Sequence, residues 1–229
     1  MFQLNKIEWT LWLSSSTLIL LSFLCFDGAH YLTLAASLIG VTSLIYSARG
    51  NPFGPFLMII FSILYGIISF SFHYYGEMIT YLGMTLPMSI VALASWLKNP
   101  YKGNKSEVEI NSISKKDINF MLFSTMIVTI ILYFILNFFH TANLIPSTLS
   151  VATSFLAAYL SYKRNPYFAL AYAANDIILI ILWILASITD KRYISVFVCF
   201  VTFFINDLYG FYNWKKIKRR QTIDLHVTS

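Results

Sequence analysis

The chain has 229 residues, of which 58% are apolar and 11% are charged, and its formal net charge is +6. So large an apolar share cannot be buried in one soluble core, and the basic residues are spread over several loops instead of forming the patch that DNA or RNA would need. The composition therefore excludes a soluble globular protein and a nucleic-acid partner, and it predicts a protein of the lipid bilayer.

Eight apolar segments follow one another, each near the length of about 20 residues that a hydrocarbon layer of roughly 30 Å requires. Helices satisfy their own backbone hydrogen bonds in lipid, whereas a barrel strand would be about half as long and would alternate polar with apolar residues. The predicted fold is therefore all-α and polytopic. The predicted transmembrane helices are residues 9–26, 31–48, 53–73, 77–97, 119–138, 144–162, 167–188 and 193–214.

The first span follows Lys6, as it would in a signal peptide, but no cleavage site of the small-x-small type follows Cys25. We therefore expect a retained N-terminal helix. Cys25 and Cys199 both lie inside apolar spans, where cysteine behaves as a small hydrophobe, so neither a disulfide nor a metal site is expected.

Two stretches of the chain repeat the same pattern. The first has Arg49-Gly50-Asn51-Pro52 after an apolar span and closes two spans later on Trp96-Leu97-Lys98. The second has Lys163-Arg164-Asn165-Pro166 and closes on Trp214-Lys215-Lys216. Four spans separate the two Asn-Pro pairs, so both lie on the same side of the membrane. The predicted repeat is therefore parallel, an arrangement of transporters whose substrate site lies between two repeats.

The predicted domains follow from this repeat and from one long polar stretch, residues 98–118, which contains five lysines. They are an extra N-terminal transmembrane helix (1–30), a first three-helix repeat (31–97), a cytoplasmic linker with a connecting transmembrane helix (98–143), a second three-helix repeat (144–216) and a basic cytoplasmic tail (217–229).

Basic residues set the expected orientation. Of the 16 lysines and arginines, 14 fall on one side of the predicted membrane, and the other side has Lys191 and Arg192. The positive-inside rule then places both termini in the cytoplasm, where the basic side can meet anionic lipid headgroups. Tryptophans at span ends are expected in the interfacial belt; these are Trp9, Trp96 and Trp214.

Two acidic residues lie well within predicted spans, Asp176 and Asp207, and each follows an asparagine, Asn175 and Asn206. Ionisable residues inside a bilayer are costly and normally face a protein interior or a watery cavity, so these four are candidates for substrate binding. The alternative is that they hydrogen-bond across helices and only hold the bundle together.

At 100° per residue, Tyr172, Asp176 and Trp183 share one stripe of a helix, with Asn175 beside it. This wall suits a ligand with a flat ring and several hydroxyls, because aromatic side chains stack on a ring while carboxylates and amides bind hydroxyls.

The span at 77–97 presents Tyr81 and Thr85 on another stripe, and both are candidate substrate contacts. Pro87 is expected to bend this helix, and bent helices often flank transporter sites. Methionine and tyrosine at helical spacing also occur as simple packing, which is the alternative here.

Histidines give no metal site. His30, His73 and His140 map to the outer ends of spans, and their spacing matches no ligand motif. The chain also has no HExxH, GxSxG or P-loop sequence. We therefore expect no catalytic residue, metal or cofactor, although an intramembrane enzyme or a receptor-like component is the alternative of another class.

Four segments resemble the Pnu family of vitamin transporters, best known for uptake of nicotinamide riboside. They are Asn51-Pro52-Phe53-Gly54, Tyr74-Tyr75-Gly76-Glu77, Ser95-Trp96-Leu97-Lys98 and the closing residues 209–216. The resemblance implies a three-plus-one-plus-three fold distantly like that of SWEET sugar carriers. It also implies facilitated diffusion of an unphosphorylated vitamin across a bacterial plasma membrane, followed by trapping through a cytoplasmic kinase. The expected partners are a small-molecule vitamin or nucleoside, the bilayer and that kinase, with a homo-oligomer left open.

One departure from the family concerns the substrate. Nicotinamide riboside members carry Trp-x-x-Trp and Asn-x-x-Trp pairs, whereas residues 165–172 here have Tyr167, Phe168 and Tyr172 in place of the expected tryptophans. Nicotinamide riboside is the leading ligand. Carriers of thiamine, riboflavin or deoxynucleosides are alternatives, as is a proton-coupled carrier that uses Asp176 or Asp207.

Overall fold

The computed structural model describes residues 4–71, 75–141 and 143–228. These residues contain eight helical segments long and apolar enough to cross a membrane, so the predicted all-α, polytopic fold is confirmed. In chain order the helices are α1 (Lys6–Ser22) with the π-helix η1 (Phe23–Asp27), α2 (Tyr31–Ala48), α3 (Phe53–Ser71), α4 (Tyr75–Thr80), the π-helix η2 (Tyr81–Thr85), α5 (Leu86–Lys98), α6 (Lys115–Phe138), α7 (Leu144–Tyr162), α8 (Tyr167–Thr189), the 3-10 helix η3 (Lys191–Tyr193) and α9 (Ile194–Thr228).

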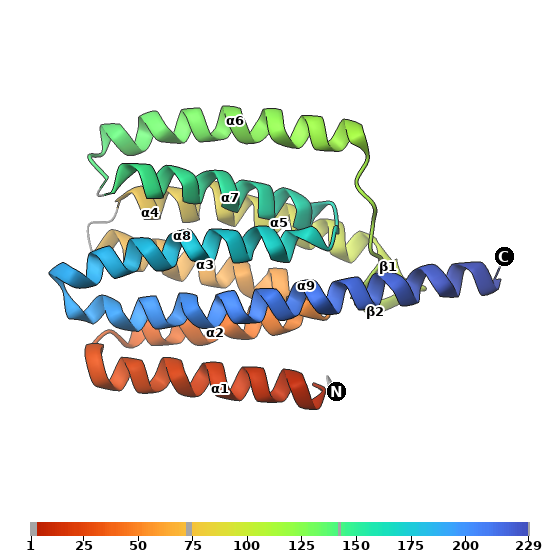
Figure 1. Cartoon of the computed structure of the whole chain (residues 1–229), viewed down its shortest axis with the longest axis horizontal. Helices are drawn as coiled ribbons and strands as arrows, with labels where there is room; N and C mark the ends of the chain where they lie inside the picture. Colours follow the sequence, from red (N-terminus) through yellow and green to blue (C-terminus); the bar gives the residue numbers. More distant parts are fainter. Residues whose placement is uncertain (1–3, 72–74, 142, 229) are drawn as a thin grey trace.

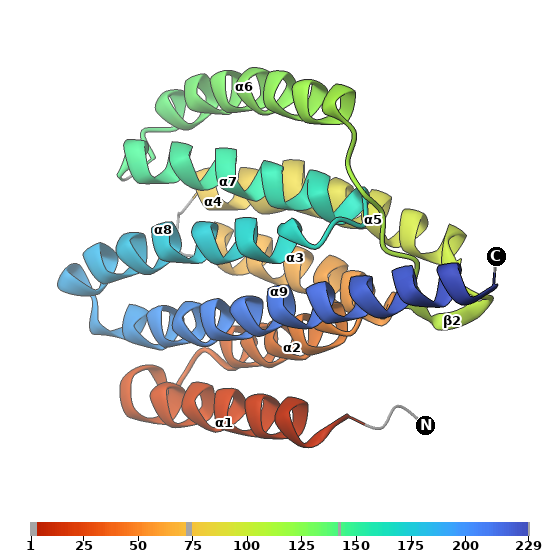
Figure 2. The same ribbon diagram turned by 45° about the vertical axis from the view of Figure 1, so that its right-hand side comes forward.

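The helices lie side by side, with α6 and α1 on the two outer sides and α7, α8 and α9 between them (Figures 1 and 2). α8 packs against α7 and α9, while α2 packs against α3 and α9. Both termini lie at the same end of the bundle. We call it the basic end, because it also carries Arg49, Lys98, Lys163, Arg164 and Lys215.

Local sequence explains where two of the helices begin. α1 starts with a capping box, in which the side chain of Asn5 accepts from the backbone N–H of Glu8 and the Glu8 carboxylate accepts from the backbone N–H of Asn5. α6 starts with the same reciprocal pair, formed by Ser114 and Asp117. Each box satisfies two N–H groups that have no partner within the helix, so each fixes the first turn.

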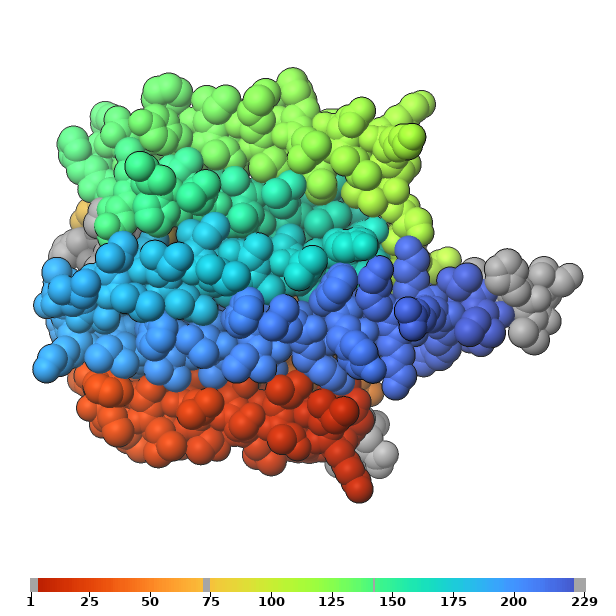
Figure 3. Space-filling view, viewed as in Figure 1, coloured from red at the N-terminus to blue at the C-terminus, as the bar shows by residue number. Residues whose placement is uncertain are grey.

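The surface of the bundle is strongly apolar where a bilayer would surround it. α6 forms one whole edge of the molecule (Figure 3) and exposes a row of large side chains, an extended apolar face that soluble proteins avoid. These include Phe120, Leu122, Phe123, Phe134 and Phe138.

The linker contains a short β-hairpin that the sequence did not predict. β1 (Pro100–Tyr101) pairs antiparallel with β2 (Asn104–Val108). Gly103 lies in the turn at φ 77°, a left-handed backbone that glycine adopts without steric cost.

The same linker binds to both halves of the bundle. The backbone N–H of Val108 donates to the carbonyl of Gly50 at 2.8 Å, and the N–H of Asn111 donates to the carbonyl of Arg164 at 3.0 Å. The two acceptors lie in the turns that carry the two Asn-Pro pairs. The linker therefore spans the gap between the matching turns.

α9 continues beyond Trp214 to Thr228, through the segment predicted as a basic tail. Gln221 holds this extension against the linker, because its side chain makes three hydrogen bonds to it. Its Nε2 donates to Glu107 Oε1 at 2.8 Å and to the carbonyl of Val108 at 3.1 Å, while its Oε1 accepts from the N–H of Ile110 at 2.8 Å. The tail is helical because the linker folds against it.

Candidate functional site

Two buried carboxyl groups meet between α8 and α9. Asp176 and Asp207 are 4% and 5% exposed, and their carboxyl groups lie close to each other. Two carboxylates in a buried site repel each other and only accept hydrogen bonds, so a single proton shared between them would stabilise the pair. No described residue donates to the buried Oδ2 of Asp176. The pair therefore has room for one further hydrogen bond.

Two tyrosines lie close to this carboxyl pair. Tyr172 on α8 is near both aspartates, and Tyr81 of η2 is near Asp176. The structure thus brings together side chains from two predicted stripes, one on each half of the chain. Whether they bind substrate stays a prediction.

Tyr81 is the link from the carboxyl pair to a cluster of rings. Its ring centroid lies 4.6 Å from that of Tyr65, whose ring meets Trp183 edge-on at 6.4 Å. Trp183 also packs on Tyr193 at 5.4 Å and is buried. The face of α8 that carries Asp176 and Trp183 is therefore an inner wall of the bundle, as its periodicity predicted.

η2 positions Tyr81. In this π-turn the N–H of Leu86 bonds to the carbonyl of Tyr81, and Pro87 follows at the start of α5. Proline has no N–H to donate, so the regular α-helical hydrogen bonding is interrupted just before Pro87, and the expected bend of this helix stays a prediction. Thr85 is less available than predicted, because its hydroxyl donates to the carbonyl of Thr80 at 3.3 Å.

The two asparagines face away from the carboxyl pair. Oδ1 of Asn175 accepts from the hydroxyls of Ser150 and Thr153 on α7, both at 3.0 Å. Nδ2 of Asn206 donates to Ser15 Oγ on α1 at 2.9 Å. Both amides join neighbouring helices, which is the packing role that the sequence left as the alternative.

A narrow cavity continues from Tyr172 toward the basic end. It has a volume of about 20 Å³, near the room that one water needs. Both halves line it, with Leu44, Ser47, Met58, Met88 and Ala92 from the first and Ala158, Ser161, Phe168 and Tyr172 from the second. A vitamin-sized ligand can enter only if helices or side chains move.

Two tryptophans bind Ser47 and Ser161, two of the serines that line this cavity. Trp96 is 1% exposed, and its indole N–H donates to the carbonyl of Ser161 at 2.8 Å. Trp214 is 0% exposed and donates to the carbonyl of Ser47 at 2.7 Å. Their ring centroids lie 5.2 Å apart. The expectation that these two tryptophans lie in the interfacial belt is wrong, since both are buried inside the protein. Trp9 is 47% exposed, and its place in the interfacial belt stays a prediction.

These contacts, which we call the tryptophan clamps, are reciprocal. Ser161 lies 114 positions after Ser47, the same shift that relates the two Asn-Pro pairs. The residue before each tryptophan adds a second bond: Ser95 Oγ donates to the carbonyl of Tyr162 at 2.8 Å, and Asn213 Nδ2 donates to that of Ala48 at 2.9 Å. Residues at the end of α5 in the first half therefore bind the end of α7 in the second half. Residues of α9 in the second half bind the end of α2 in the first.

His73 lies outside the described residues, as does Tyr74 of the sequence resemblance. His30 Nδ1 lies 2.5 Å from Asp27 Oδ1. Within the described ranges no three His, Cys, Asp or Glu side chains gather as a metal site would require. The expectation of a metal-free and cofactor-free protein stays a prediction.

Comparison with known proteins agrees with this architecture. A family model described as nicotinamide mononucleotide transporter matches residues 30–216. The nicotinamide riboside transporter PnuC of Neisseria mucosa is 24% identical over 203 residues, which cover 86% of this chain and 76% of that protein. PnuC of Haemophilus influenzae is 22% identical over 190 residues, which cover 83% and 81%.

A solved structure has the same fold. The crystal structure of the vitamin B3 transporter PnuC superimposes with a TM-score of 0.81 and 20% identity, covering 96% of this chain and 94% of the other. The resemblance drawn from sequence motifs is thereby confirmed, as is the prediction that the chain is not an enzyme. The chain belongs to the nicotinamide mononucleotide transporter family and is a multi-pass membrane transporter of PnuC type.

Proposed function

We propose that this transporter takes up a nucleoside-like vitamin, with nicotinamide riboside the leading ligand. The relatives named above carry that substrate in their names, and this supports the choice. The observation that carries the proposal is the buried Asp176–Asp207 pair beside Tyr81 and Tyr172.

The chemistry of this site fits a cationic ring attached to a sugar. Carboxyl oxygens accept hydrogen bonds from ribose hydroxyls and attract a positive pyridinium ring. Aromatic side chains such as Trp183 offer π-faces to the same ring. Burial strengthens both interactions, because the interior screens charge less than water does.

Transport is by facilitated diffusion, with a cytoplasmic kinase trapping the product by phosphorylation. The basic end faces the cytoplasm, so both termini lie there, in the plasma membrane of a bacterium. The distribution of lysine and arginine supports this orientation, and the bacterial sources of the two relatives support the membrane.

Substrate passes between the halves, which form a parallel repeat. The reciprocal tryptophan clamps support this, since related contacts recur under the shift that relates the sequences. The clamps join the two halves at the basic end, so release into the cytoplasm between the halves requires at least one of them to open.

Two measurements test the proposal. Purified protein is first heated with nicotinamide riboside, thiamine, riboflavin or a deoxynucleoside, and the true ligand raises the melting temperature because it binds only the folded state. Uptake of that ligand is then followed in sealed vesicles. It should stop at the outside concentration and rise further only when a kinase and ATP are enclosed. Nicotinamide riboside that neither raises the melting temperature nor enters vesicles would overturn the assignment.

A proton-coupled carrier is the second candidate, and the closeness of the buried carboxyl groups of Asp176 and Asp207 favours it. Two such groups can share a proton and release it during a transport cycle. Accumulation above the outside concentration in kinase-free vesicles, abolished by a protonophore, would replace facilitated diffusion with this mechanism.

A further inference from the structure

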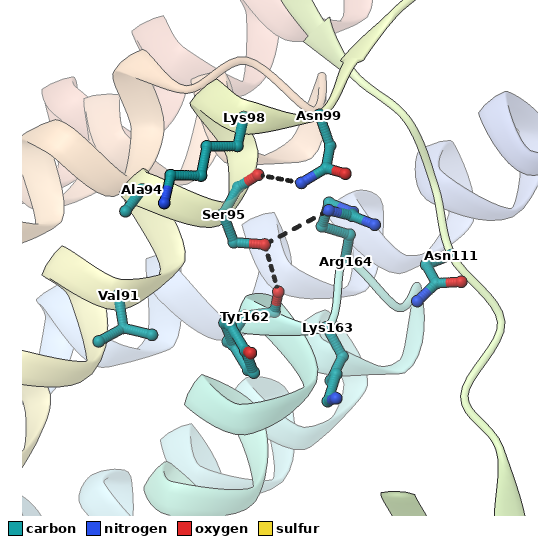
Figure 4. Close-up of a pocket in the computed structure, with 9 residues that line it drawn as sticks. All are labelled: Val91, Ala94, Ser95, Lys98, Asn99, Asn111, Tyr162, Lys163 and Arg164. Atoms are coloured by element: carbon teal, nitrogen blue, oxygen red, sulfur yellow. Dashed lines mark hydrogen bonds between the residues drawn. The ribbon is translucent and has the colours of Figure 1, made fainter.

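A second cavity, of about 430 Å³, lies at the basic end between α5 and the turn that joins α7 to α8 (Figure 4). Its polar wall is rich in hydrogen-bond donors. Lys98, Ser95 and Asn99 come from the end of α5, Arg164 from the turn and Asn111 from the linker. None of these residues takes part in the substrate site described above.

Arg164 occupies a backbone position that favours glycine. Its φ is 57°, in the left-handed region, and the matching residue of the first half is Gly50, at φ 68°. A side chain in this conformation crowds the following carbonyl, and only glycine avoids that cost. Arginine therefore strains the turn, and nothing in the backbone of the turn requires it.

The guanidinium of Arg164 is poorly satisfied within the protein. Its Nη1 donates to Ser95 Oγ at a long 3.5 Å, and its buried Nε has no acceptor among the described residues. Burial lowers the pKa of Arg164, partly offset by the nearby Glu109, but an arginine remains charged at neutral pH. No described carboxylate lies within ion-pair distance of Arg164 or Lys98.

The matching cavity of the other half has acidic residues among its basic ones. It has a volume of about 480 Å³ and holds Arg49, Lys216 and Arg220. Glu8 and Glu107 line it too; Glu8 lies 3.8 Å from Arg49, and Glu107 pairs with Arg220. The cavity at Arg164 has no acid in its wall. Lys163, on its rim, is paired with Asp117 at 2.8 Å.

We propose that the cavity at Arg164 binds a phosphate group. A guanidinium, an ammonium and two amides are donors suited to phosphate oxygens, and arginine binds such oxygens through two parallel hydrogen bonds. Two sources share this chemistry. The exposed Val91 and Ala94 form the apolar part of the wall, which suits the headgroup of an anionic phospholipid, while a soluble phosphate ester would reach the same donors from the cytoplasm.

Binding here would act on a tryptophan clamp. Ser95 Oγ accepts from Arg164 and donates to the carbonyl of Tyr162, next to Ser161, which accepts from Trp96. A phosphate that draws the guanidinium away from Ser95 changes the contacts that hold α5 on α7.

The test uses the full chain in detergent. Binding is followed by melting temperature with inorganic phosphate, compared with chloride at equal ionic strength, and by native mass spectrometry with phosphatidylglycerol against phosphatidylcholine. The double variant R164G/K98Q should bind the active probe at least about tenfold more weakly, because two charge-assisted contacts are lost. The double variant K105Q/K116Q loses the same charge outside the cavity and should bind as the wild type does.

The outcomes separate the sources. A response to inorganic phosphate alone supports a soluble phosphate ester, and selective retention of phosphatidylglycerol alone supports a lipid headgroup. The proposal is overturned if the wild type responds to neither probe, if R164G/K98Q binds as tightly as the wild type, or if K105Q/K116Q loses binding equally. Loss of binding by the variant can be told apart from unfolding by its melting temperature without ligand. R164G alone relieves the strained turn, so its melting temperature should be no lower than that of the wild type.

Discussion

The two turns that carry the Asn-Pro pairs have the same backbone but different surroundings. In both, the asparagine side chain accepts from an N–H two residues on, at 2.9 Å for Asn51 and 3.1 Å for Asn165. A Cβ on Gly50 would lie 3.3 Å from a methyl of Val108, so the linker leaves it little space. Arg164 instead directs its side chain into a cavity. The difference teaches that the Asn-Pro motif specifies the turn, while the packing around it decides which residue can occupy the left-handed position.

The largest effect is expected at the tryptophan clamps. Replacing Trp96 or Trp214 by Ala should lower the free energy of unfolding by about 3 to 5 kcal/mol, since a buried ring and its hydrogen bond are both lost. Thermal unfolding in detergent, followed by circular dichroism, measures this. Trp9→Ala is the control, because that ring is largely exposed and should matter little. If one clamp proves costly and the other neutral, the two halves are not energetically equivalent.

The next effect concerns ligand affinity. Asp176→Ala or Asp207→Ala should weaken binding by about 1 to 3 kcal/mol, the usual cost of losing one partner at a buried site. The double variant should lose less than the sum, because the two carboxyl groups lie close together and their effects are coupled. Calorimetric titration with the ligand found by thermal shift provides the numbers.

Asn175→Ala is the matched control for the carboxyl pair. Sequence alone predicts that it abolishes most substrate binding and leaves the protein folded. The structure predicts a loss of stability with affinity kept, because the amide oxygen accepts from Ser150 and Thr153 on α7. An affinity loss as large as that of Asp176→Ala would return Asn175 to the substrate site.

Trp183 reports on the charge of the ligand ring. Trp183→Ala should weaken binding more than Trp183→Phe, since stacking on a ring is worth about 1 to 3 kcal/mol. Indole attracts cations better than phenyl does, so a further several-fold loss on going to Phe would indicate a cationic vitamin. Equal affinity for the wild type and both variants would place the site away from Trp183.

The smallest effect has opposite signs in the two turns. Gly50→Ala should destabilise the protein by about 1 to 2 kcal/mol, and Arg164→Gly should stabilise it by a similar or smaller amount, because a left-handed backbone penalises any Cβ. Chemical unfolding of both variants gives the sign directly. A destabilised R164G would mean that the arginine side chain contributes more to folding than its backbone costs.

Sequence periodicity predicted the spans well, because length and hydropathy are local properties. The helices at 31–48 and 144–162 have the predicted bounds, and each is followed by a basic turn. The stripe with Asp176 and Trp183 faces inward as expected. Periodicity identifies a buried face, and it does so without any information on neighbouring helices.

The missed features all depend on contacts between distant segments. The helix contacts of Asn175 and Asn206 are one example, because their partners lie on α7 and α1, which a helical wheel does not show; their role in substrate binding stays a prediction. Trp96 and Trp214 stand at span ends, and only the packing of two halves reveals that they are buried. The pairing of Asp176 with Asp207 likewise needed the contact between α8 and α9.

The linker sets a mechanical limit on the transport cycle. Val108 binds the turn of the first half and Asn111 binds the turn of the second, and three residues of chain separate the two N–H groups. An extended chain spans at most about 3.6 Å per residue, so these attachment points can separate to roughly 11 Å and no further while both bonds hold. Any movement of the two turns apart is therefore limited by this short piece of chain. A wider separation of the two turns must first break one of these two hydrogen bonds. The linker therefore limits how far the basic end can open during transport.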